Sequence, residues 1–485
     1  MLFNSYEFIF LFLPITFFIY FFLNKKGLYT ESKLFIVAAS LFFYSWWNVV
    51  YLPLIILSMA FNYFIGNAFS KEKNLIFSRK TILIFGIAAN VLLLGYFKYY
   101  DFFIENVNFI TGANLPLLHL ALPLAISFFT FQQIAYLVDS YKGETKEYNF
   151  LNYAVFVTFF PQLIAGPIVH HKEMMPQFDD ENAKKINYKN IAIGLTIFAI
   201  GLFKKVAIAD TLAVYANAGF DEATQLKFIE AWVTSLSYTF QLYFDFSGYT
   251  DMAIGAALLF NIKLPQNFNS PYKAKNIQDF WRRWHITLSR FLRDYIYIPL
   301  GGNKKGEMKT YRNLFLTFLI GGIWHGAGWT FVIWGAMHGI AMIIHRIWQK
   351  FKIKLSSFTA WFITFNFVNL TWVFFRAENF ESALKVLKGM FGLNGIVVPY
   401  SIGLKFPILA DFGIEFERIM KDINANNELL LLLFAFALIA FLGKNSYEIT
   451  KNLKPKKVYI VGVSLLFSIA ILKLNQISEF LYFNF

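Results

Sequence analysis

The chain has 485 residues, of which 57% are hydrophobic, 20% aromatic and 15% charged, and its formal net charge is +14. Soluble domains carry about a quarter charged residues, so this composition excludes an ordinary soluble protein and predicts an all-α, multi-pass membrane protein. The chain contains no cysteine, which excludes disulfides and means that any covalent intermediate must form on an oxygen or nitrogen nucleophile.

Apolar windows of about 17 to 25 residues, long enough to cross a bilayer, recur along the whole chain. They lie near residues 7–23, 34–50, 52–69, 81–98, 119–139, 150–169, 190–210, 229–260, 312–325, 329–347, 357–375, 428–443 and 457–473. We expect about 11–13 crossings, some of them tilted, broken or re-entrant. Lys25 and Lys26 follow the first window without a cleavage site, so this window predicts a retained span rather than a signal peptide.

Prolines interrupt the helical pattern in the middle third of the chain, at Pro123, Pro161 and Pro167. Broken backbone at membrane depth is tolerated only where it lines a cavity or is buried in protein. We therefore expect this third to surround a cavity. The least apolar part of the second half, 376–427, is expected to form a loop with short helices on the outer face.

Basic residues gather in four places that fit the cytoplasmic side of the membrane. They are Lys25, Lys26 and Lys33; Lys71, Lys73, Arg79 and Lys80; the stretch 261–312; and Lys444, Lys451, Lys454, Lys456 and Lys457. This distribution predicts that the N-terminus and the C-terminus both lie on the outer face.

The stretch 263–312 is strongly basic, with eleven Lys and Arg against Asp279, Asp294 and Glu307, which gives eight of the chain's fourteen net positive charges. Such a local charge predicts a cytoplasm-facing surface and a site for an anionic cofactor. The alternative is that the charge only sets the topology and contacts lipid headgroups.

His285 lies inside this basic stretch. Asn276 followed by Asp279 resembles a helix N-cap pair, and the helix that follows is expected to place Trp281, Trp284, His285, Leu288, Ser289 and Leu292 on one face. An imidazole on such a face is a buried polar group that needs a partner. It is either functional or a structural histidine satisfied by a neighbouring helix.

His325 follows an apolar window and is flanked by Gly322, Gly326 and Gly328. These glycines permit close backbone approach and a helix break, which would turn the imidazole toward a cavity. A neutral imidazole can take a proton from a hydroxyl at physiological pH, as acyl transfer to an alcohol requires. The alternative is a structural role, which is the role expected for His338 thirteen residues later.

Two carboxylates, Asp245 and Asp251, lie inside an apolar window and must pair or face water. We expect a buried ion pair that locks two helices, with Arg282, Arg283 and Arg293 as the available partners.

The chain ends in the sequence SEFLYFNF, and Tyr482 carries the one side-chain hydroxyl in its last six residues. It could accept and carry an acyl group, or the aromatic tail could simply be an interfacial anchor.

Four motifs carry a resemblance to a known family: PQLIAGPIVH, FDFSGYTDMAIG, PQNFNSPYKAKNIQDFWRRWHITLSRFLRDYIYIPLGGN and GGIWHGAGWTFVIWGAMHG. With them the chain resembles the membrane-bound O-acyltransferase family, in its bacterial alginate and peptidoglycan O-acetyltransferase branch, and more distantly the teichoic-acid D-alanyl transfer protein. The resemblance covers about residues 5–375. The terminal F-x-Y-F-x-F pattern is similar to a tail that the D-alanylation system carries on a separate small protein.

The resemblance implies a ring of helices around a central funnel or tunnel, with His325 as the catalytic histidine and His285 as its accompanying polar residue. It implies acetyl-CoA from the cytoplasm as acyl donor, with no permanently bound cofactor and no metal. It also implies delivery of the acetyl group through an exported partner of the SGNH-hydrolase type. Membrane lipid is the other expected partner, and no nucleic acid is expected.

These observations predict a single membrane domain over 1–485, made of scaffold helices (1–260), a catalytic core (261–339), C-terminal helices (340–473) and an outer tail (474–485). The phosphates of acetyl-CoA are expected at five basic residues: Lys273, Lys275, Arg282, Arg283 and Arg293.

His325 would take the proton from the Tyr482 hydroxyl as it attacks the thioester, or acetyl would pass directly to a partner. The predicted function is O-acetylation of a cell-surface polysaccharide, first peptidoglycan, at the bacterial cytoplasmic membrane. The alternatives are alginate or another exopolysaccharide as acceptor, D-alanyl transfer to teichoic acid, and a carrier or flippase.

Overall fold

The computed structural model describes residues 1–69, 77–145, 149–451, 453, 456–474 and 481. Its chain divides into two compact units. Unit 1 consists of Met1–Phe203, Gly248–Asn267 and Ser446–Phe485, and unit 2 of Lys204–Ser247 and Phe268–Asn445. The stretch 268–339, which holds both predicted catalytic histidines, therefore falls within unit 2.

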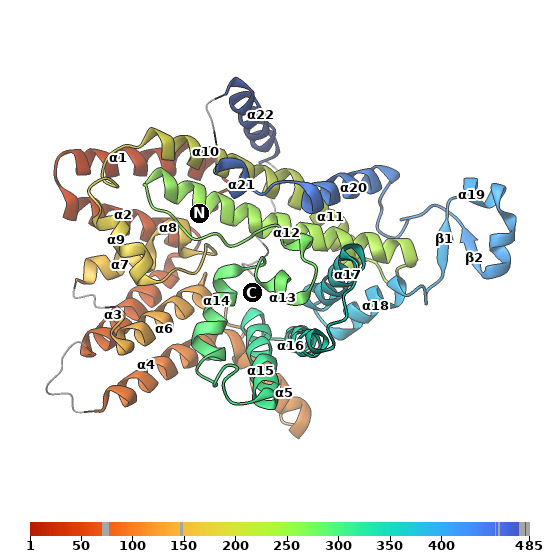
Figure 1. The fold of residues 1–485 in the computed structure, drawn as a ribbon, viewed down its shortest axis with the longest axis horizontal. Helices are drawn as coiled ribbons and strands as arrows, with labels where there is room; N and C mark the ends of the chain where they lie inside the picture. The colour runs from red at the N-terminus through yellow and green to blue at the C-terminus, as the bar shows by residue number, and fades with distance from the viewer. Residues whose placement is uncertain (70–76, 146–148, 452, 454–455, 475–480, 482–485) are drawn as a thin grey trace. The chain divides into compact units, whose positions relative to one another are not determined.

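The regular secondary structure of unit 1 is helical in the part that the structure describes (Figure 1). Its helices are α1 (Leu13–Lys25), α2 (Tyr29–Ser45), α3 (Leu52–Ala68), α4 (Arg79–Leu94), α5 (Tyr100–Thr111), α6 (Ile126–Lys142), α7 (Phe150–Thr158), α8 (Phe160–Leu163), α9 (His171–Asp179), α10 (Tyr188–Phe203), α21 (Ser446–Thr450) and α22 (Lys457–Lys473). The break between α7 and α8 precedes Pro161, so this predicted interruption is confirmed. Pro123 and Pro167 lie in connecting segments, again as predicted.

Unit 2 contains the remaining helices and two short strands (Figure 1). They are α11 (Asp210–Asn217), α13 (Ile277–Trp281), α14 (Ile286–Leu292), α15 (Glu307–His325), α16 (Trp329–Phe351), α17 (Ser357–Arg376), α18 (Phe380–Met390), β1 (Ile396–Val398), α19 (Tyr400–Lys405), β2 (Ile414–Phe416) and α20 (Asn427–Leu442). One long helix, α12 (Phe228–Leu259), contributes residues to both units.

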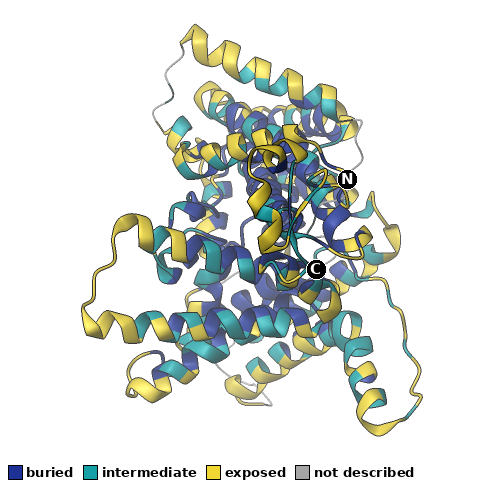
Figure 2. Ribbon diagram, turned by 90° about the vertical axis from the view of Figure 1, so that its right-hand side faces the viewer, coloured by how far each residue is buried: buried dark blue, intermediate teal, exposed yellow. Residues whose placement is uncertain are grey.

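Every predicted apolar window contains a helix, which confirms the all-α, multi-pass class. Within the described residues, six helical segments are long and apolar enough to cross a membrane. They are Glu7–Lys25, Val49–Ala68, Arg79–Thr111, Tyr188–Glu222, Trp329–Phe351 and Ser357–Arg376, and Asn427–Leu442 is a shorter apolar helix. Many helices carry buried residues along one side and exposed residues along the other (Figure 2), and the exposed residues include many Phe, Leu and Ile. A bilayer would cover such apolar faces.

The region 376–427 departs in one respect from the short helices that the sequence predicts. α18 and α19 are present, but β1 and β2 also pair in parallel, with Ile396 opposite Ile414 and Val398 opposite Phe416. Three residues per strand give too short an alternation to be recognised in the sequence.

α15 and α16 form an antiparallel pair in which glycines let the two backbones approach. A β-carbon added at Gly322 would lie 2.5 Å from the Phe331 carbonyl oxygen, and one at Gly335 would lie 2.6 Å from the Phe318 carbonyl oxygen. Lipid gives little hydrophobic drive between helices, so close packing through small residues has to hold such a pair together. At its other end, the pair is joined by an ion pair between Glu307 and Lys350, and the hydrogen bond from Lys350 lowers the pKa of Glu307.

Candidate active site

His325 is the last residue of α15, and only 2% of it is exposed. The helix ends because the backbone becomes extended at Gly326. A side chain at Gly326 would overlap the ring of Phe331, so glycine allows this loop to fold against α16. The helix break predicted from the glycines beside His325 is therefore confirmed.

Aromatic rings from three helices surround the His325 imidazole. The ring centroids of Trp324 on α15, Trp334 on α16 and Phe375 on α17 lie 4.9, 5.1 and 5.1 Å from it, all close to edge-on. These contacts fix the orientation of the imidazole and remove water from around it. Hydrogen bonds and charges act more strongly in such apolar surroundings than in water.

His285 lies between two short helices rather than within one. α13 ends at Trp281, α14 begins at Ile286, and His285 adopts a left-handed backbone conformation with φ of 43°. The prediction of a single continuous helix through His285 is wrong, although its start is right, because the Asn276 side chain accepts a hydrogen bond of 2.8 Å from the Asp279 amide. Helical periodicity continues across the break, so the apolar pattern does not reveal it.

The break turns His285 into the interior, where it is fully buried. Its ring lies 4.8 Å from Phe246 of α12 and 6.4 Å from Trp324. Because Trp324 also contacts His325, one indole touches both of the predicted catalytic histidines. The third predicted catalytic residue, Tyr482, lies outside the described residues.

His338 has the packing role that its sequence context predicts. The indole N–H of Trp281 donates to His338 Nδ1 at 3.2 Å, and His338 Nε2 lies 3.1 Å from the Thr371 hydroxyl oxygen. With Nδ1 accepting, Nε2 carries the proton and donates to Thr371. This histidine joins α13, α16 and α17.

Trp334, which the sequence analysis did not single out, lies between His325 of α15 and His338 of α16. Its ring is 5.1 Å from His325 and 4.7 Å from His338, and Trp372 stacks on it at 5.7 Å. Among the described residues, its buried indole N–H has no hydrogen-bond partner. The four-residue spacing between Trp334 and His338 could have indicated their shared helix face, but no sequence pattern connects Trp372 or Phe375 to His325.

Asp245 forms the buried ion pair that the sequence predicts, but with a different partner. Lys205 Nζ lies 2.7 Å from Asp245 and 2.7 Å from Asp210, and all three side chains are almost completely buried. Asp245 thus pairs with a lysine rather than with one of the expected arginines, of which Arg283 pairs with Asp279 and Arg293 with Asp294. Lys205 lies inside the predicted apolar window 190–210 and was assigned no role in the sequence analysis.

The other carboxylate, Asp251, lies in unit 1. It accepts a hydrogen bond of 2.7 Å from the Ser446 hydroxyl, which ties α12 to α21. Asp245 and Asp251 therefore each link distant segments of the chain, in different units.

The five basic residues predicted to bind phosphate have varied surroundings in unit 2. Lys273 donates to the Gly443 carbonyl at 2.6 Å, Arg283 pairs with Asp279, and Arg293 pairs with Asp294, whose hydrogen bond raises the pKa of Arg293. Lys275 and Arg282 are exposed, and Lys275 Nζ lies 3.1 Å from the Ser357 hydroxyl. Arg293 is exposed as well, but Lys275 and Arg282 form no ion pair with another described residue, which leaves them available to an anionic ligand.

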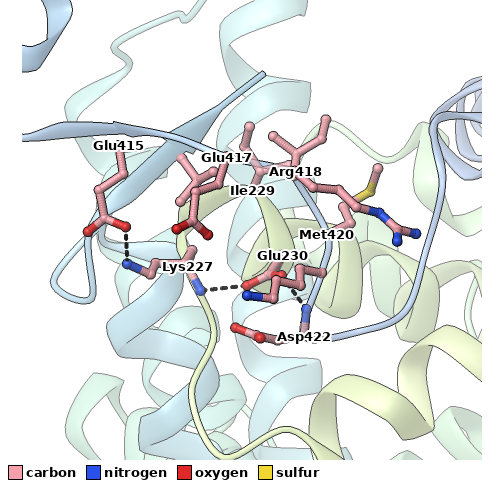
Figure 3. Close-up of a pocket in the computed structure, with 11 residues that line it drawn as sticks. Lys227, Ile229, Glu230, Glu415, Glu417, Arg418, Met420 and Asp422 are labelled. Atoms are coloured by element: carbon pink, nitrogen blue, oxygen red, sulfur yellow. Dashed lines mark hydrogen bonds and ion pairs between the residues drawn. The ribbon is translucent and has the colours of Figure 1, made fainter. Parts of the chain in front are cut away.

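A cavity of about 220 Å³ elsewhere in unit 2 is lined by charged and apolar residues, and some of the charged side chains contact one another or nearby backbone amides (Figure 3). Glu230 accepts hydrogen bonds from the backbone amides of Lys227 and Asp422, at 3.0 and 2.8 Å, and the Lys227 ammonium lies 2.7 Å from Glu415. These contacts attach the loop after β2 to the start of α12. The polar contacts beside this cavity therefore have a structural role.

The model of the membrane-bound O-acyltransferase family matches residues 8–383, more than three quarters of the chain. The chain belongs to this family. As a membrane-bound O-acyltransferase it is an acyltransferase and a multi-pass membrane protein, and the carrier or flippase alternative is set aside.

Three relatives show where this O-acyltransferase lies within the family. It is 52% identical to the peptidoglycan O-acetyltransferase of Helicobacter pylori, over 100% of this chain and 98% of the relative. It is 41% identical to a probable alginate O-acetylase of Pseudomonas aeruginosa, over 86% of this chain and 82% of the relative. It is 30% identical to a teichoic acid D-alanyltransferase of Bacillus subtilis, over 53% and 69% respectively.

Proposed function

We propose that this O-acyltransferase takes acetyl from cytoplasmic acetyl-CoA for the O-acetylation of a cell-surface polysaccharide, and that the polysaccharide is peptidoglycan. The observation that carries the choice of acceptor is the 52% identity over the whole chain to a relative named for peptidoglycan. The relatives named for alginate and for teichoic acid are less similar and, in the two cases above, cover less of the chain.

His325 acts as the general base in this proposal. It is held edge-on by Trp324, Trp334 and Phe375 in a site from which water is excluded, where proton transfer by a positioned imidazole contributes about 10²- to 10⁴-fold in rate. Because His325 is buried, the acetyl arm can reach it only when some of these aromatic side chains move apart. His285, which shares the Trp324 indole, orients the donor or stabilises developing charge.

The acyl acceptor in this proposal is the Tyr482 hydroxyl, in a chain that has no thiol. The phenol oxygen attacks the thioester carbonyl, the C–S bond breaks, and the phenol proton passes through His325 to the leaving thiolate. The products are acetyl-tyrosine and free CoA. Transfer to an exported partner of the SGNH-hydrolase type then returns the tyrosine to its free form.

The phosphates of the donor bind at the basic cytoplasmic stretch, where Arg282 and Arg293 are among the exposed cations. The protein lies in the bacterial cytoplasmic membrane with both termini on the outer face, as its basic loops favour. An acetyl group relayed in this way crosses the bilayer without export of acetyl-CoA.

Intact mass measurement after incubation of the purified chain with acetyl-CoA tests both the base and the relay. We expect the mass to increase by one acetyl group on Tyr482, and we expect no increase in Tyr482→Phe. His325→Ala should reduce thioester cleavage about 10²- to 10⁴-fold without changing the unfolding temperature greatly. An exposed histidine of unit 1 supplies the control, since His119→Asn should leave cleavage unchanged.

The possible outcomes separate the two parts of the proposal. If a preparation that cleaves acetyl-CoA with its partner carries no adduct after incubation with acetyl-CoA alone, the tyrosine relay is refuted and direct transfer remains. If His325→Ala cleaves acetyl-CoA at the wild-type rate, the general-base role is refuted. Release of acetate from purified peptidoglycan, compared with alginate and teichoic acid, tests the acceptor.

A further inference from the structure

A groove of about 660 Å³ lies in unit 2, away from the ring contacts of His325. Its lining residues come mainly from α16 and α17, and three more lie at or just before the start of α13. The lining is mainly apolar and consists of Lys275, Asn276, Ile277, Met337, Ile340, Ala341, Ile344, His345, Trp348, Leu355, Ala360, Ile363, Thr364 and Phe367. A volume of this size is typical of a site for a single small ligand.

The basic residues of the groove, Lys275 and His345, lie toward one end, whereas the polar residue Thr364 lies farther along α17. The Lys275 ammonium lies 3.1 Å from the hydroxyl of Ser357, the first residue of α17, and His345 and Trp348 line the same end from the last turns of α16. The N-terminus of α17 adds the positive end of a 20-residue helix, capped by Ser356. Arg282 is close enough to act electrostatically on His345. This end of the groove therefore favours an anion.

The rest of the groove follows two helices that are apolar and long enough to cross a membrane. Met337 and Trp348, which line its two ends on α16, are eleven residues apart in the sequence. At 1.5 Å per residue this separation is about 16 Å, close to half of the roughly 30 Å hydrocarbon core of a bilayer. The groove thus has the length of one leaflet and a cationic end where the headgroups of that leaflet would lie.

We propose that this groove binds one anionic phospholipid of the cytoplasmic leaflet. One acyl chain lies along Ile340, Ile344 and Ile363, and the phosphate lies against Lys275 and the N-terminus of α17. The charge of the polar end matches an anionic lipid, because the described residues there are cationic or neutral. The cytoplasmic leaflet is the one that carries anionic lipids. Lipid binding in this groove does not depend on which acyl acceptor the enzyme uses.

The end of the groove lined by Phe367 lies next to the aromatic residues around His325 and His338. The ring of Phe367 lies 5.5 Å from His338, which in turn contacts Trp334 beside His325. An acyl chain packed against Phe367 would stabilise this arrangement of α16 and α17. Lipid binding should therefore raise thermal stability and be lost when the groove is filled.

Thermal unfolding of the purified full chain in a mild, non-ionic detergent provides the test. Phosphatidylglycerol should raise the unfolding temperature by several degrees, and phosphatidylcholine with the same acyl chains should raise it much less. Ala360→Phe and Ala341→Phe, which fill the groove from opposite walls, should abolish the difference. Lys275→Gln should reduce it, and Lys354→Gln, at an exposed lysine outside the groove, should retain it.

A soluble anion separates lipid binding from phosphate binding alone. Glycerol phosphate should cause no shift, because it lacks the acyl chain that fills the groove. The proposal is overturned if the two lipids give equal shifts, if both filled variants fold and keep the full phosphatidylglycerol shift, or if glycerol phosphate gives the whole effect. Native mass spectrometry of the wild-type chain should show one tightly bound phosphatidylglycerol, and none in Ala360→Phe.

Discussion

At the scale of single residues, His285 combines a buried side chain with an unusual backbone. Non-glycine residues with positive φ pay for close contacts of the β-carbon, and His285 has φ of 43° in full burial. Strained positions of this kind persist where the surrounding structure fixes them, and they are enriched at functional sites. Phe246 and Trp324 supply this support on either side of the imidazole.

The stability of variants at His285 should depend on how readily the new residue adopts a positive φ rather than on how hydrophobic it is. Asn adopts left-handed conformations readily, whereas the β-branched side chain of Val does not. His285→Asn should therefore be more stable than His285→Val by about 1–2 kcal/mol, although Val is better suited to an apolar pocket. Thermal unfolding of the two variants in one detergent measures the difference, and the opposite order of stability would contradict this account of the kink.

At the scale of elements, the α15–α16 pair positions His325 at its tip and depends on close contact between the two helices. The would-be β-carbons of Gly322 and Gly335 point at backbone carbonyl oxygens of the partner helix. Backbone cannot move aside as the end of a side chain can. A larger residue at either position would therefore push the two helices apart.

Gly335→Ala should separate α15 from α16 and destabilise the protein by about 1–3 kcal/mol, as overpacking usually does. It should also lower acyl transfer, because Trp334 is the adjacent residue and contacts His325. Gly462→Ala is the matched control: it lies in α22 with open space around it, and alanine there should be neutral or stabilising by up to about 1 kcal/mol. Equal unfolding temperatures for Gly335→Ala and wild type would show that the helices are not closely packed.

At the scale of the whole molecule, the basic loops and the apolar helices together determine the expected topology. The stretch 263–312 carries most of the excess positive charge, whereas 376–427 is the predicted outer loop. Lys304 and Leu404 are exposed representatives of these two segments. Because the chain has no cysteine, a single introduced thiol reports its own position without background.

Labelling with a membrane-impermeant maleimide should distinguish the two faces. Leu404→Cys should react in intact cells from which any outer barrier has been removed, and Lys304→Cys should react only after the cytoplasmic membrane is permeabilised. Wild-type protein should not react in either condition. The reverse pattern for the two variants would place the termini and the basic stretch on the opposite sides from those proposed.

Several features of the fold follow from local sequence pattern and could be predicted. Apolar windows located the helices, Asn276 marked the start of α13, and the glycines after His325 marked the end of α15. Each of these follows from side chains within a few residues of one another, where helix periodicity and capping act directly. The motif resemblance led to the family that the comparisons then showed.

Only the tertiary structure decided which distant residues meet. It placed Lys205 rather than an arginine beside Asp245, turned His285 inward at a left-handed residue, and surrounded His325 with Trp334 and Phe375. An apolar pattern shows which face of a helix is buried, but many neighbours satisfy the same pattern equally well. The choice among them depends on packing shape and on the pairing of buried charges, and both arise only when the whole chain is assembled.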